Sequence, residues 1–569
     1  MRTDFGMTAR ITRTDGARRT TFAARTAAIL LAALASSVAV GVRAQGWFRL
    51  YDGAAHLDDV AHTLARDTSG NLYVAGSTTT VSGTTDILLL KYSADGALQW
   101  QATADPSAGG DDQALALVLD GAGNAILAGS ARAGYDADLV VLKYTPAGAL
   151  AWQRTFVGTT ASDDGAVAIA TDGANRIVVL GSTFSSTTGA DFLLLQYSAD
   201  GTLTWQVTID GGAAAADYPT ALAVNSTGDA VATGFSTRSD LTTDVLTIRC
   251  TASGTVAWSR LYAGSASDDD WGLDVVLDAT GNTYVTGFVE TGAASADCVT
   301  LKYASDGSLA WDRVFDGSLQ DHDSGHAIAV DTSGNVYVGG ATRDAAGAFD
   351  FLVLAYSNAG GFLWSRSWSG AADGRDEAGL VAADGSGGVL VVGESDGSVG
   401  GLDIVTLRYS SAGAVLGQGR FAGSAHGVDS PGGLVVAGPS LGSLVGTSAE
   451  STGDDALVLT FDPTTITDVE VEEVALPNEV TLTPFRPHPL RAGGVIRFAV
   501  PRPAKVTLEI VNVAGRVVRR LMANEPVGPG HHVHSLERGQ LPAGVYFIVL
   551  RVQDDISTVT RRQKIVRLP

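Results

Sequence analysis

Residues 86–92 read DILLLKY, an aspartate followed by an apolar run and an aromatic residue, and this short pattern decides the fold because it returns seven more times. The other copies are DLVVLKY from Asp138, DFLLLQY from Asp191, DVLTIRC from Asp244, DCVTLKY from Asp297, DFLVLAY from Asp350, DIVTLRY from Asp403 and DALVLTF from Asp455. Successive copies lie 52 or 53 residues apart. A fixed period of this size is typical of a repeat architecture in which each copy is one supersecondary unit.

Each period holds four short strand patterns and no helix pattern. An apolar segment (strand A) ends in a turn such as DTSGN and is followed by a second apolar segment such as LYVAGS (strand B). The DILLLKY pattern is strand C, and a glycine four residues after its aromatic residue leads into strand D, which contains a tryptophan, as in Gly96 and Trp100. Four antiparallel strands in a repeat of this length are typical of a β-propeller blade.

The two ends of the repeat region predict how the ring closes. The region begins with a D-type strand, because Trp47 stands 53 residues before Trp100, and it ends with a C-type strand at Phe461. We therefore expect the segment of Trp47 to complete the last blade and to remove an open sheet edge. An eight-bladed β-propeller over residues 45–461 results if the segment around Gly417 is a degenerate D strand, and a seven-bladed ring is the alternative. The repeat resembles those of bacterial surface and secreted proteins, which specifies the fold and leaves the function open.

The N-terminus has the order of a secretory signal peptide. Six arginines between Arg2 and Arg25 precede the apolar run TAAILLAALASSVAVGV, and Val42-Arg43-Ala44 predicts cleavage after Ala44. The pair Arg18-Arg19 keeps the twin-arginine route open beside the general secretory route. Residues 1–44 are thus expected to be removed, and no later apolar run is long enough to cross a bilayer.

Net charge limits the classes of partner, and the positions of the two cysteines argue against a disulfide. The net charge is −23, and because both ends are basic, residues 45–477 alone carry −36. Such a surface repels nucleic acid and attracts cations or basic partners. Cys250 and Cys298 fall at opposite ends of equivalent strands in neighbouring repeats, so we expect two free, partly buried thiols.

A second aspartate recurs near the start of strand A, and it has two interpretations. The positions are Asp59, Asp112, Asp164, Asp217, Asp270, Asp323 and Asp376, with Ser430 at this place in the eighth copy. If strand A is innermost, these carboxylates would form a ring at one mouth of the channel that could hold calcium or a basic ligand. In the second interpretation each aspartate caps the loop before its blade by accepting backbone N–H bonds. Repetition in every copy favours this structural role, and no other cofactor is expected.

No sequence pattern in the chain predicts a complete catalytic or metal site. Residues 438–442 read GPSLG but lie at a turn between strands, whereas a nucleophile elbow joins a strand to a helix. Residues 321–326 read DHDSGH, and His531, His532 and His534 share one predicted strand, but neither set predicts a complete metal site. The tryptophans of strand D are expected to act as wedges between blades.

A second domain follows an acidic linker at residues 462–478. Residues 479–569 contain the predicted strands VIRFAVP, KVTLEIVNVAG, HHVHSLE, GVYFIVLRV and TVTRRQKIVRL, enough for a small antiparallel sandwich. TPF at 483–485, VAGRVV at 513–518, Gly530-His531, LPAGVYF at 541–547 and RQKIV at 562–566 follow one another in the order of a known family. The region resembles the type A sorting domain of the type IX secretion system, an immunoglobulin-like fold.

The resemblance implies a sorting role and a set of motif residues. By likeness to the family, these would be Pro484, Phe485, Gly515, Gly530, His531, Gly544, Tyr546 and Lys564. The opening departs from the family form, because Arg486-Pro487-His488-Pro489 stands where a more regular run is usual. The resemblance implies that the domain contacts the type IX machinery and carries the propeller to the outer-membrane surface or the extracellular medium.

Taken together, these patterns predict an exported, monomeric binding propeller that engages an unidentified protein or glycan and is not an enzyme. Two alternatives stay open. One is a secreted polysaccharide hydrolase or lyase with its site at the channel mouth, which would need an asymmetric cluster of acid, base and cation. The other is a structural component of the cell envelope.

Overall fold

The computed structural model describes two compact units, one ending at Glu470 and the other beginning at Val471. The described residues are 47–567 without 135, 160–161, 265–268, 292–295, 318–320, 345–346, 371–373, 397–400, 424–426, 439–440, 451–452, 463–468, 471–479, 483–493, 502–503, 528–529, 537–540 and 555–556. All regular secondary structure within these ranges is β-strand. The predicted signal peptide lies outside the described residues.

The first unit is a ring of four-stranded antiparallel sheets. From strand A to strand D, the sheets are β2 (Asp59–Arg66), β3 (Leu72–Thr79), β4 (Thr85–Tyr92) and β5 (Leu98–Ala104); β6 (Asp111–Leu119), β7 (Ala125–Ala133), β8 (Asp136–Tyr144) and β9 (Leu150–Phe156); β10 (Gly165–Thr171), β11 (Ile177–Ser185), β12 (Gly189–Tyr197) and β13 (Leu203–Ile209); β14 (Asp217–Val224), β15 (Ala230–Thr237), β16 (Thr243–Cys250) and β17 (Val256–Tyr262); β18 (Trp271–Leu277), β19 (Thr283–Glu290), β20 (Ala296–Tyr303) and β21 (Leu309–Phe315); β22 (Asp323–Val330), β23 (Val336–Arg343), β24 (Phe349–Tyr356) and β25 (Phe362–Trp368); β26 (Asp376–Ala383), β27 (Gly388–Asp396), β28 (Leu402–Ser410) and β29 (Val415–Ala422); β30 (Ser430–Val436), β31 (Gly442–Ala449), β32 (Asp454–Phe461) and β1 (Trp47–Tyr51).

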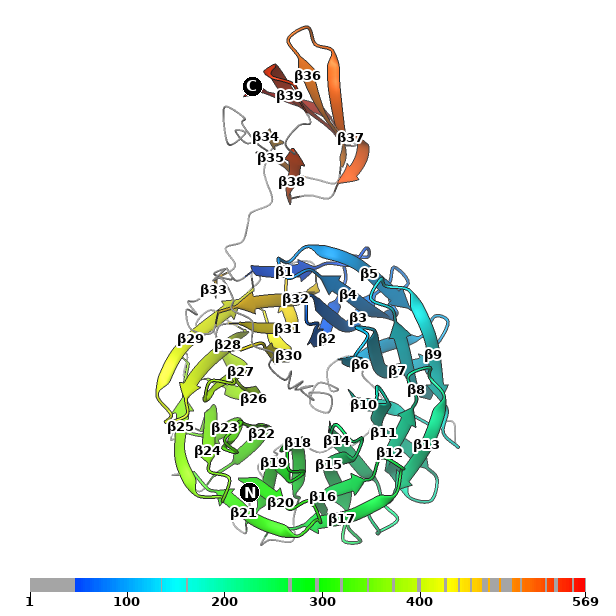
Figure 1. Cartoon of the computed structure of the whole chain (residues 1–569), viewed down its shortest axis with the longest axis vertical. Coiled ribbons are helices and arrows are strands. Elements are labelled where there is room, and N and C mark those ends of the chain that lie inside the picture. The colour runs from blue at the N-terminus through cyan, green and yellow to red at the C-terminus, as the bar shows by residue number, and fades with distance from the viewer. Residues whose placement is uncertain are drawn as a thin grey trace. The chain divides into compact units, whose positions relative to one another are not determined.

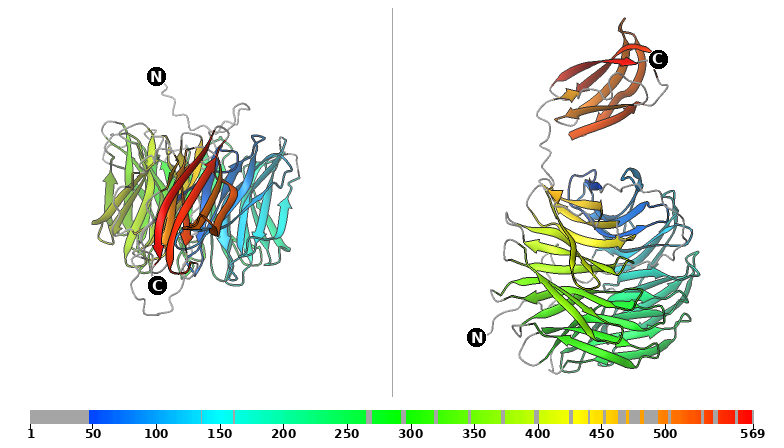
Figure 2. Two further views of the ribbon diagram at one scale, coloured as in Figure 1. Left: turned by 90° about the horizontal axis from the view of Figure 1, so that it is seen from above. Right: turned by 60° about the vertical axis from the view of Figure 1, so that its left-hand side comes forward.

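Strand A is the innermost and strand D the outermost strand of each sheet (Figure 1). Seen edge-on, the strands run between the two faces of the ring (Figure 2). The loops from D to A and from B to C therefore lie on one face, and the turns from A to B and from C to D lie on the other. The prediction of an all-β chain built from four-stranded propeller blades is confirmed.

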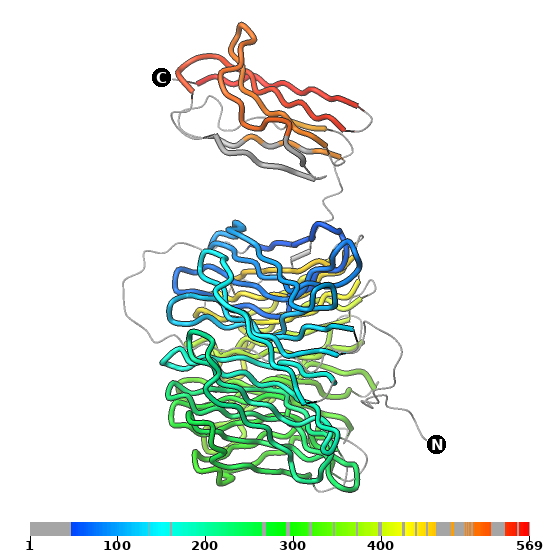
Figure 3. The backbone as a smooth tube through the Cα atoms, turned by 90° about the vertical axis from the view of Figure 1, so that its right-hand side faces the viewer, coloured from blue at the N-terminus to red at the C-terminus, as the bar shows by residue number. Residues whose placement is uncertain are grey.

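The N-terminal strand belongs to the last sheet. β1 pairs with β32 from Trp47 opposite Thr460 to Tyr51 opposite Ala456, so that the first and last described strands of the ring lie side by side (Figure 3). The Trp47 Nε1–H donates to the carbonyl of Ala94 at 3.0 Å, and Arg49 Nε donates to the carbonyl of Gly96 at 2.8 Å. β1 thus joins the last sheet to the first.

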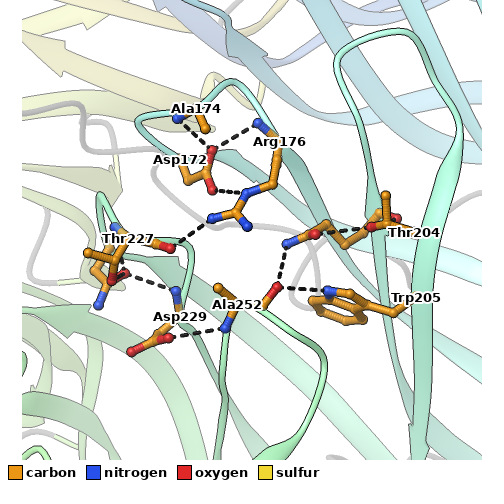
Figure 4. A network of polar contacts seen from close by, with 10 residues as sticks. Asp172, Ala174, Arg176, Thr204, Trp205, Thr227, Asp229 and Ala252 are labelled. Atoms are coloured by element: carbon orange, nitrogen blue, oxygen red, sulfur yellow. Dashed lines mark hydrogen bonds and ion pairs between the residues drawn. The ribbon is translucent and has the colours of Figure 1, made fainter.

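The same contact recurs between neighbouring sheets. Trp258 Nε1 donates to the Ser305 carbonyl at 3.2 Å in the next sheet's C–D turn, and Trp205 Nε1 donates to the Ala252 carbonyl at 3.1 Å (Figure 4). Gly307 lies in the turn that Trp258 contacts, with φ of 81°, and a Cβ there would stand 2.6 Å from the indole. The glycine four residues after the aromatic residue is therefore required both by its positive φ and by the tryptophan packed against it.

The apolar cores lie between adjacent sheets. One core joins Ala128 and Val141 of one sheet to Ile177 and Leu193 of the next. Because both faces of each sheet are covered, strands such as β16 are buried at every position instead of alternating between buried and exposed. Cys250 and Cys298 are both free and fully buried within these cores.

The second unit packs two antiparallel sheets against each other. One sheet has the order β34 (Thr481–Leu482), β35 (Gly494–Val500), β38 (Gly530–Leu536), and the other has the order β37 (Val517–Val527), β36 (Ala504–Asn512), β39 (Gly544–Gln553), β40 (Thr558–Arg567). Phe498 of the first sheet shares a core with Leu508 and Ile548 of the second. A short strand, β33 (Val469–Glu470), pairs in parallel with β29 in the first unit.

Candidate functional site

The strand A aspartates lie at the D–A loop face of the ring, and they are buried. All seven predicted positions are at most 2% exposed. In six of the seven, the carboxylate accepts the backbone N–H of the glycine six residues earlier, as in Asp217 and Gly211 at 2.5 Å and Asp270 and Gly264 at 2.6 Å. Asp112 accepts instead from Ser107 at 3.3 Å. The carboxylates hold the D–A loop, and their burial keeps them out of contact with a ligand in the channel.

The eighth copy carries the same group. Pro431 pairs with Gly446 as Ala61 pairs with Gly76, so Asp429, and not Ser430, is the structural equivalent of Asp59. Asp429 is 1% exposed and accepts the N–H groups of Gly423 at 2.5 Å and Ala449 at 3.1 Å. Sequence spacing misplaced this copy by one residue.

Burial shapes the electrostatics of these carboxyl groups. Desolvation raises the pKa of Asp59, Asp164 and Asp323, and backbone N–H donors oppose this shift without cancelling it. The pKa of Asp270 is raised to about 6, with desolvation as the largest cause. A raised pKa shows that the negative charge is incompletely compensated inside the loop.

Two further carboxylates join the strand A aspartate at four joins between sheets. In each, one oxygen from the aspartate that begins strand C, one from an aspartate directly after strand D and one from strand A of the next sheet lie within 4.8 Å of one another. The four groups, called the carboxylate triads below, are Asp86, Asp105 and Asp112; Asp191, Asp210 and Asp217; Asp297, Asp316 and Asp323; and Asp455, Asp52 and Asp59.

The aspartates after strand D were missed by the sequence analysis. Asp52, Asp105, Asp210 and Asp316 each stand seven residues before a strand A aspartate, and this recurrence in four of eight copies was the available signal. The strand C aspartates were visible as a motif, but the sequence alone gave no reason to place them beside the D–A loop.

Two other joins hold an arginine in place of the third carboxylate. Arg238 Nη1 lies 3.0 Å from Asp244 Oδ1, and alanine (Ala263) stands at the position after strand D. Arg420 forms an ion pair with Asp403, and alanine (Ala422), the last residue of β29, stands seven residues before the strand A aspartate Asp429. The strand C carboxylate at these joins is therefore neutralised by a side chain of its own sheet.

The D–A loop face also carries an exposed row of acids. Asp58, Asp111 and Asp163 each precede a strand A aspartate, are exposed, and accept a backbone N–H at 3.2 Å. On the opposite face, acidic residues of the A–B turns are paired with bases from the ends of strand C, as in Lys143 with Asp120 at 2.8 Å and Arg408 with Asp384 at 2.6 Å. Of the exposed row, Asp163 also forms an ion pair with Arg132 at 3.1 Å.

Among the described residues, the histidines of the pattern at 321–326 contact other groups and belong to none of the clusters of possible metal ligands. His326 contacts the Ser324 hydroxyl at 2.8 Å and the Ala378 carbonyl at 3.0 Å, whereas His322 Nδ1 accepts the N–H of Ala296 at 3.2 Å. His531, His532 and His534 all lie in β38. Of the GPSLG sequence, residues 439–440 lie outside the described part of the chain.

The sorting-motif residues fall at several places in the second unit. Gly515 has φ of 76° in the turn between β36 and β37, whereas Gly530 and His531 begin β38 in the other sheet. Gly544 and Tyr546 lie in β39, and the Tyr546 hydroxyl donates to the Pro542 carbonyl at 3.0 Å. Lys564 in β40 pairs with Phe547. Pro484 and Phe485 lie outside the described residues.

Comparisons with known proteins identify the repeat. The family model of the β-propeller repeat matches residues 47–80 and 317–343. No curated protein matches the chain. No helix in the described part of the chain is long and apolar enough to span a membrane.

Solved structures share parts of the architecture at low identity. Sqt1 from Chaetomium thermophilum is 13% identical with a TM-score of 0.46, over 73% of this chain and 98% of that one. A protein of unknown function from Bacteroides caccae is 12% identical with a TM-score of 0.28, over 46% and 82%. The polysaccharide lyase Uly1 is 9% identical with a TM-score of 0.39, over 70% and 89%. All three TM-scores are below 0.5.

Proposed function

We propose that this β-propeller repeat protein is an exported binding module whose acidic D–A loop face engages a basic protein or a cationic glycan. The exposed row of Asp58, Asp111 and Asp163 on that face carries the proposal. Exposed charge of one sign on one face attracts and orients an oppositely charged partner, although Asp163 is also paired with Arg132 at 3.1 Å. On the opposite face, Asp120 and Asp384 are buried and paired with bases, whereas Asp95, Asp200 and Asp306 of the C–D turns are exposed and provide the matched control.

A binding role is favoured over catalysis by the symmetry of the ring. The strand A carboxylates are buried and occupied by loop N–H groups, so they cannot reach a substrate in the channel. A hydrolase or lyase needs an accessible acid and base in different environments. Among the described residues, the same buried arrangement is instead repeated from sheet to sheet.

The binding proposal is tested by removing equal charge from each face. We expect the triple variant Asp58→Asn, Asp111→Asn and Asp163→Asn to weaken binding to immobilised poly-L-lysine at least tenfold at low salt. The asparagine oxygen can still accept the backbone N–H, so the fold should be retained. The matched control replaces Asp95, Asp200 and Asp306, exposed acids of the C–D turns, by asparagine. Equal weakening in both variants would show that net charge alone matters, and the proposal would fail.

We further propose that the eight sheets are the eight blades of one closed propeller, that the chain acts as a monomer, and that the second unit is a type IX sorting domain of the immunoglobulin-like class. Two packed sheets and the resemblance of residues 483–566 to that family support the sorting role. Deleting residues 479–569 in a host with this secretion system should trap the propeller inside the cell. Surface delivery of the truncated chain, followed by protease accessibility on intact cells, would contradict the sorting role.

A further inference from the structure

The carboxylate triads place three acids together at the junction of two sheets. In the join between β20 and β22, Asp297 begins strand C, Asp316 follows strand D and Asp323 begins the next sheet. Three negative charges within 4.8 Å repel one another strongly in a partly desolvated site. Such a group is stable only when protons or a cation offset the charge.

Unsatisfied oxygen atoms point to a cation. Oδ1 of Asp59, Asp191, Asp297 and Asp323 is buried and has no hydrogen-bond partner, and these residues are at most 3% exposed. Each belongs to a carboxylate triad, and every triad except that of Asp112 contains at least one such atom. A buried acceptor left unpaired carries the full desolvation penalty, and a bound cation would remove it.

The join at Asp244 can be compared directly with the joins that hold a carboxylate triad. Asp244 occupies the same strand C position as Asp191 and Asp297, but its Oδ1 is bonded to the guanidinium of Arg238. At that join the third position is alanine, not aspartate. At the two joins where an arginine pairs with the strand C aspartate, the third position is alanine, and at the four carboxylate triads it is aspartate. The two remaining joins have Val157 and Ser369 at this position. An arginine and a third carboxylate are thus not combined at any of the six charged joins, which is expected if each of them takes one positive charge.

We propose that each of the four carboxylate triads binds one Ca²⁺ ion that clamps two neighbouring blades. Carboxylate oxygens are the ligands that hard divalent cations prefer. Ca²⁺ accepts six to eight oxygen ligands in flexible geometry, whereas Mg²⁺ demands near-ideal octahedral geometry and is usually held by only one or two carboxylates, so a group of three carboxylates suits the larger ion. The third carboxylate of each triad, such as Asp316, is exposed and leaves a route for the ion to exchange with solvent.

The ion at Asp455, Asp52 and Asp59 would act where the ring closes. Asp455 lies in β32, Asp52 directly follows β1, and Asp59 begins β2. A single ligand held by these three residues joins the last sheet to the first. Calcium would therefore stabilise the closure as well as three internal joins.

The test is the stoichiometry of calcium binding to the whole chain after treatment with a chelator. Calorimetric titration and equilibrium dialysis should give about four ions for the wild type, as the four triads require. Asp316→Asn should lose one ion, because it removes one exposed ligand without disturbing the core. Asp95→Asn, an exposed acid at a C–D turn on the face opposite the carboxylate triads, should leave the count unchanged. Circular dichroism checks that both variants are folded.

Three outcomes would overturn the proposal. The first is absence of calcium binding by the chelator-treated wild type. The second is an unchanged ion count in folded Asp316→Asn. The third is displacement of calcium by an equal concentration of Mg²⁺, which would refute the identity of the ion.

Discussion

The repeated aspartates have different roles at the start of strand A and directly after strand D. At the start of strand A it is buried and satisfies loop N–H groups, and directly after strand D it is exposed and adds charge. The residue that donates its N–H to the strand A aspartate must be glycine for a steric reason. A Cβ on Gly53 would stand 2.6 Å from the Thr78 hydroxyl and 2.8 Å from the Asp59 carboxylate. A side chain at position 53 would therefore clash with the carboxylate that the loop N–H contacts, so this loop position requires glycine.

One inner-strand residue, Asp274, predicts that the stability of the folded protein depends on pH. Asp274 in β18 is buried, and its two oxygens accept the N–H groups of Val275 at 2.8 Å and Ile328 at 2.9 Å. Desolvation raises its pKa from 3.8 to about 7. The folded state therefore holds this proton more tightly than the unfolded state, and the resulting stability is lost as the pH rises from about 4 to about 7.

Asp274→Asn should flatten this pH dependence, because the amide does not titrate. We expect the variant to be less stable at pH 5 by about 1–3 kcal/mol, since its NH₂ group faces a backbone N–H. The difference from the wild type should shrink by pH 8. Urea unfolding at both pH values in the presence of chelator measures this. An equal decline in both proteins would contradict the assignment.

At the scale of elements, the join between two sheets is the unit that varies. The strands and their pairing repeat from sheet to sheet, but some joins hold a third carboxylate and others an arginine. Thr291 stands after β19 where Arg238 stands after β15, so the arginine join can be converted into the other type by two substitutions.

The double variant Arg238→Thr with Ala263→Asp should gain a calcium site. It rebuilds the Asp244 and Asp270 join with the residue types of the Asp297 and Asp323 join. We expect the calcium stoichiometry to rise by one, and the thermal midpoint in chelator to fall, because the guanidinium no longer offsets the buried charge. Arg238→Thr alone is the control. A folded double variant that binds no additional ion would count against the equivalence of the joins.

At the scale of the whole molecule, the ring depends on five residues of β1. Its hydrogen bonds to β32 and its contacts with Ala94 and Gly96 hold the last sheet to the first. Every internal join is covalently continuous through a D–A loop. Only this join has to be assembled from the two ends of the propeller sequence.

Trp47→Ala should open the closure locally. Removing the half-buried indole deletes the contact with Ala94 and its packing against Tyr92, costing about 1–3 kcal/mol, less than the loss of a fully buried tryptophan. Hydrogen exchange at β1 and β32 should become much faster, because β32 then lies at an open edge. Trp205→Ala loses an equivalent contact at an internal join and should leave exchange at β32 unchanged. Unaltered protection of β32 in Trp47→Ala would refute the role of β1 as the closing strand.

The sequence by itself determined the strands, the four-strand repeat and the expectation that Trp47 completes the last sheet. These features rest on local patterns: turn residues able to take positive φ, apolar runs of strand length and a constant spacing. The sequence showed that glycine recurs at the position of Gly307. It did not show that glycine is needed there because a tryptophan of the neighbouring sheet packs against it.

Only the tertiary structure decided what the aspartates do. Spacing along the chain placed the strand A carboxylates at the channel mouth, but packing buries them, and pairing moves the eighth member from Ser430 to Asp429. The carboxylate triads combine residues 26 positions apart, as in Asp297 and Asp323, or 396 apart, as in Asp59 and Asp455. Strand propensity and turn chemistry act over a few neighbouring residues, whereas these contacts arise only when separate sheets pack and the ring closes.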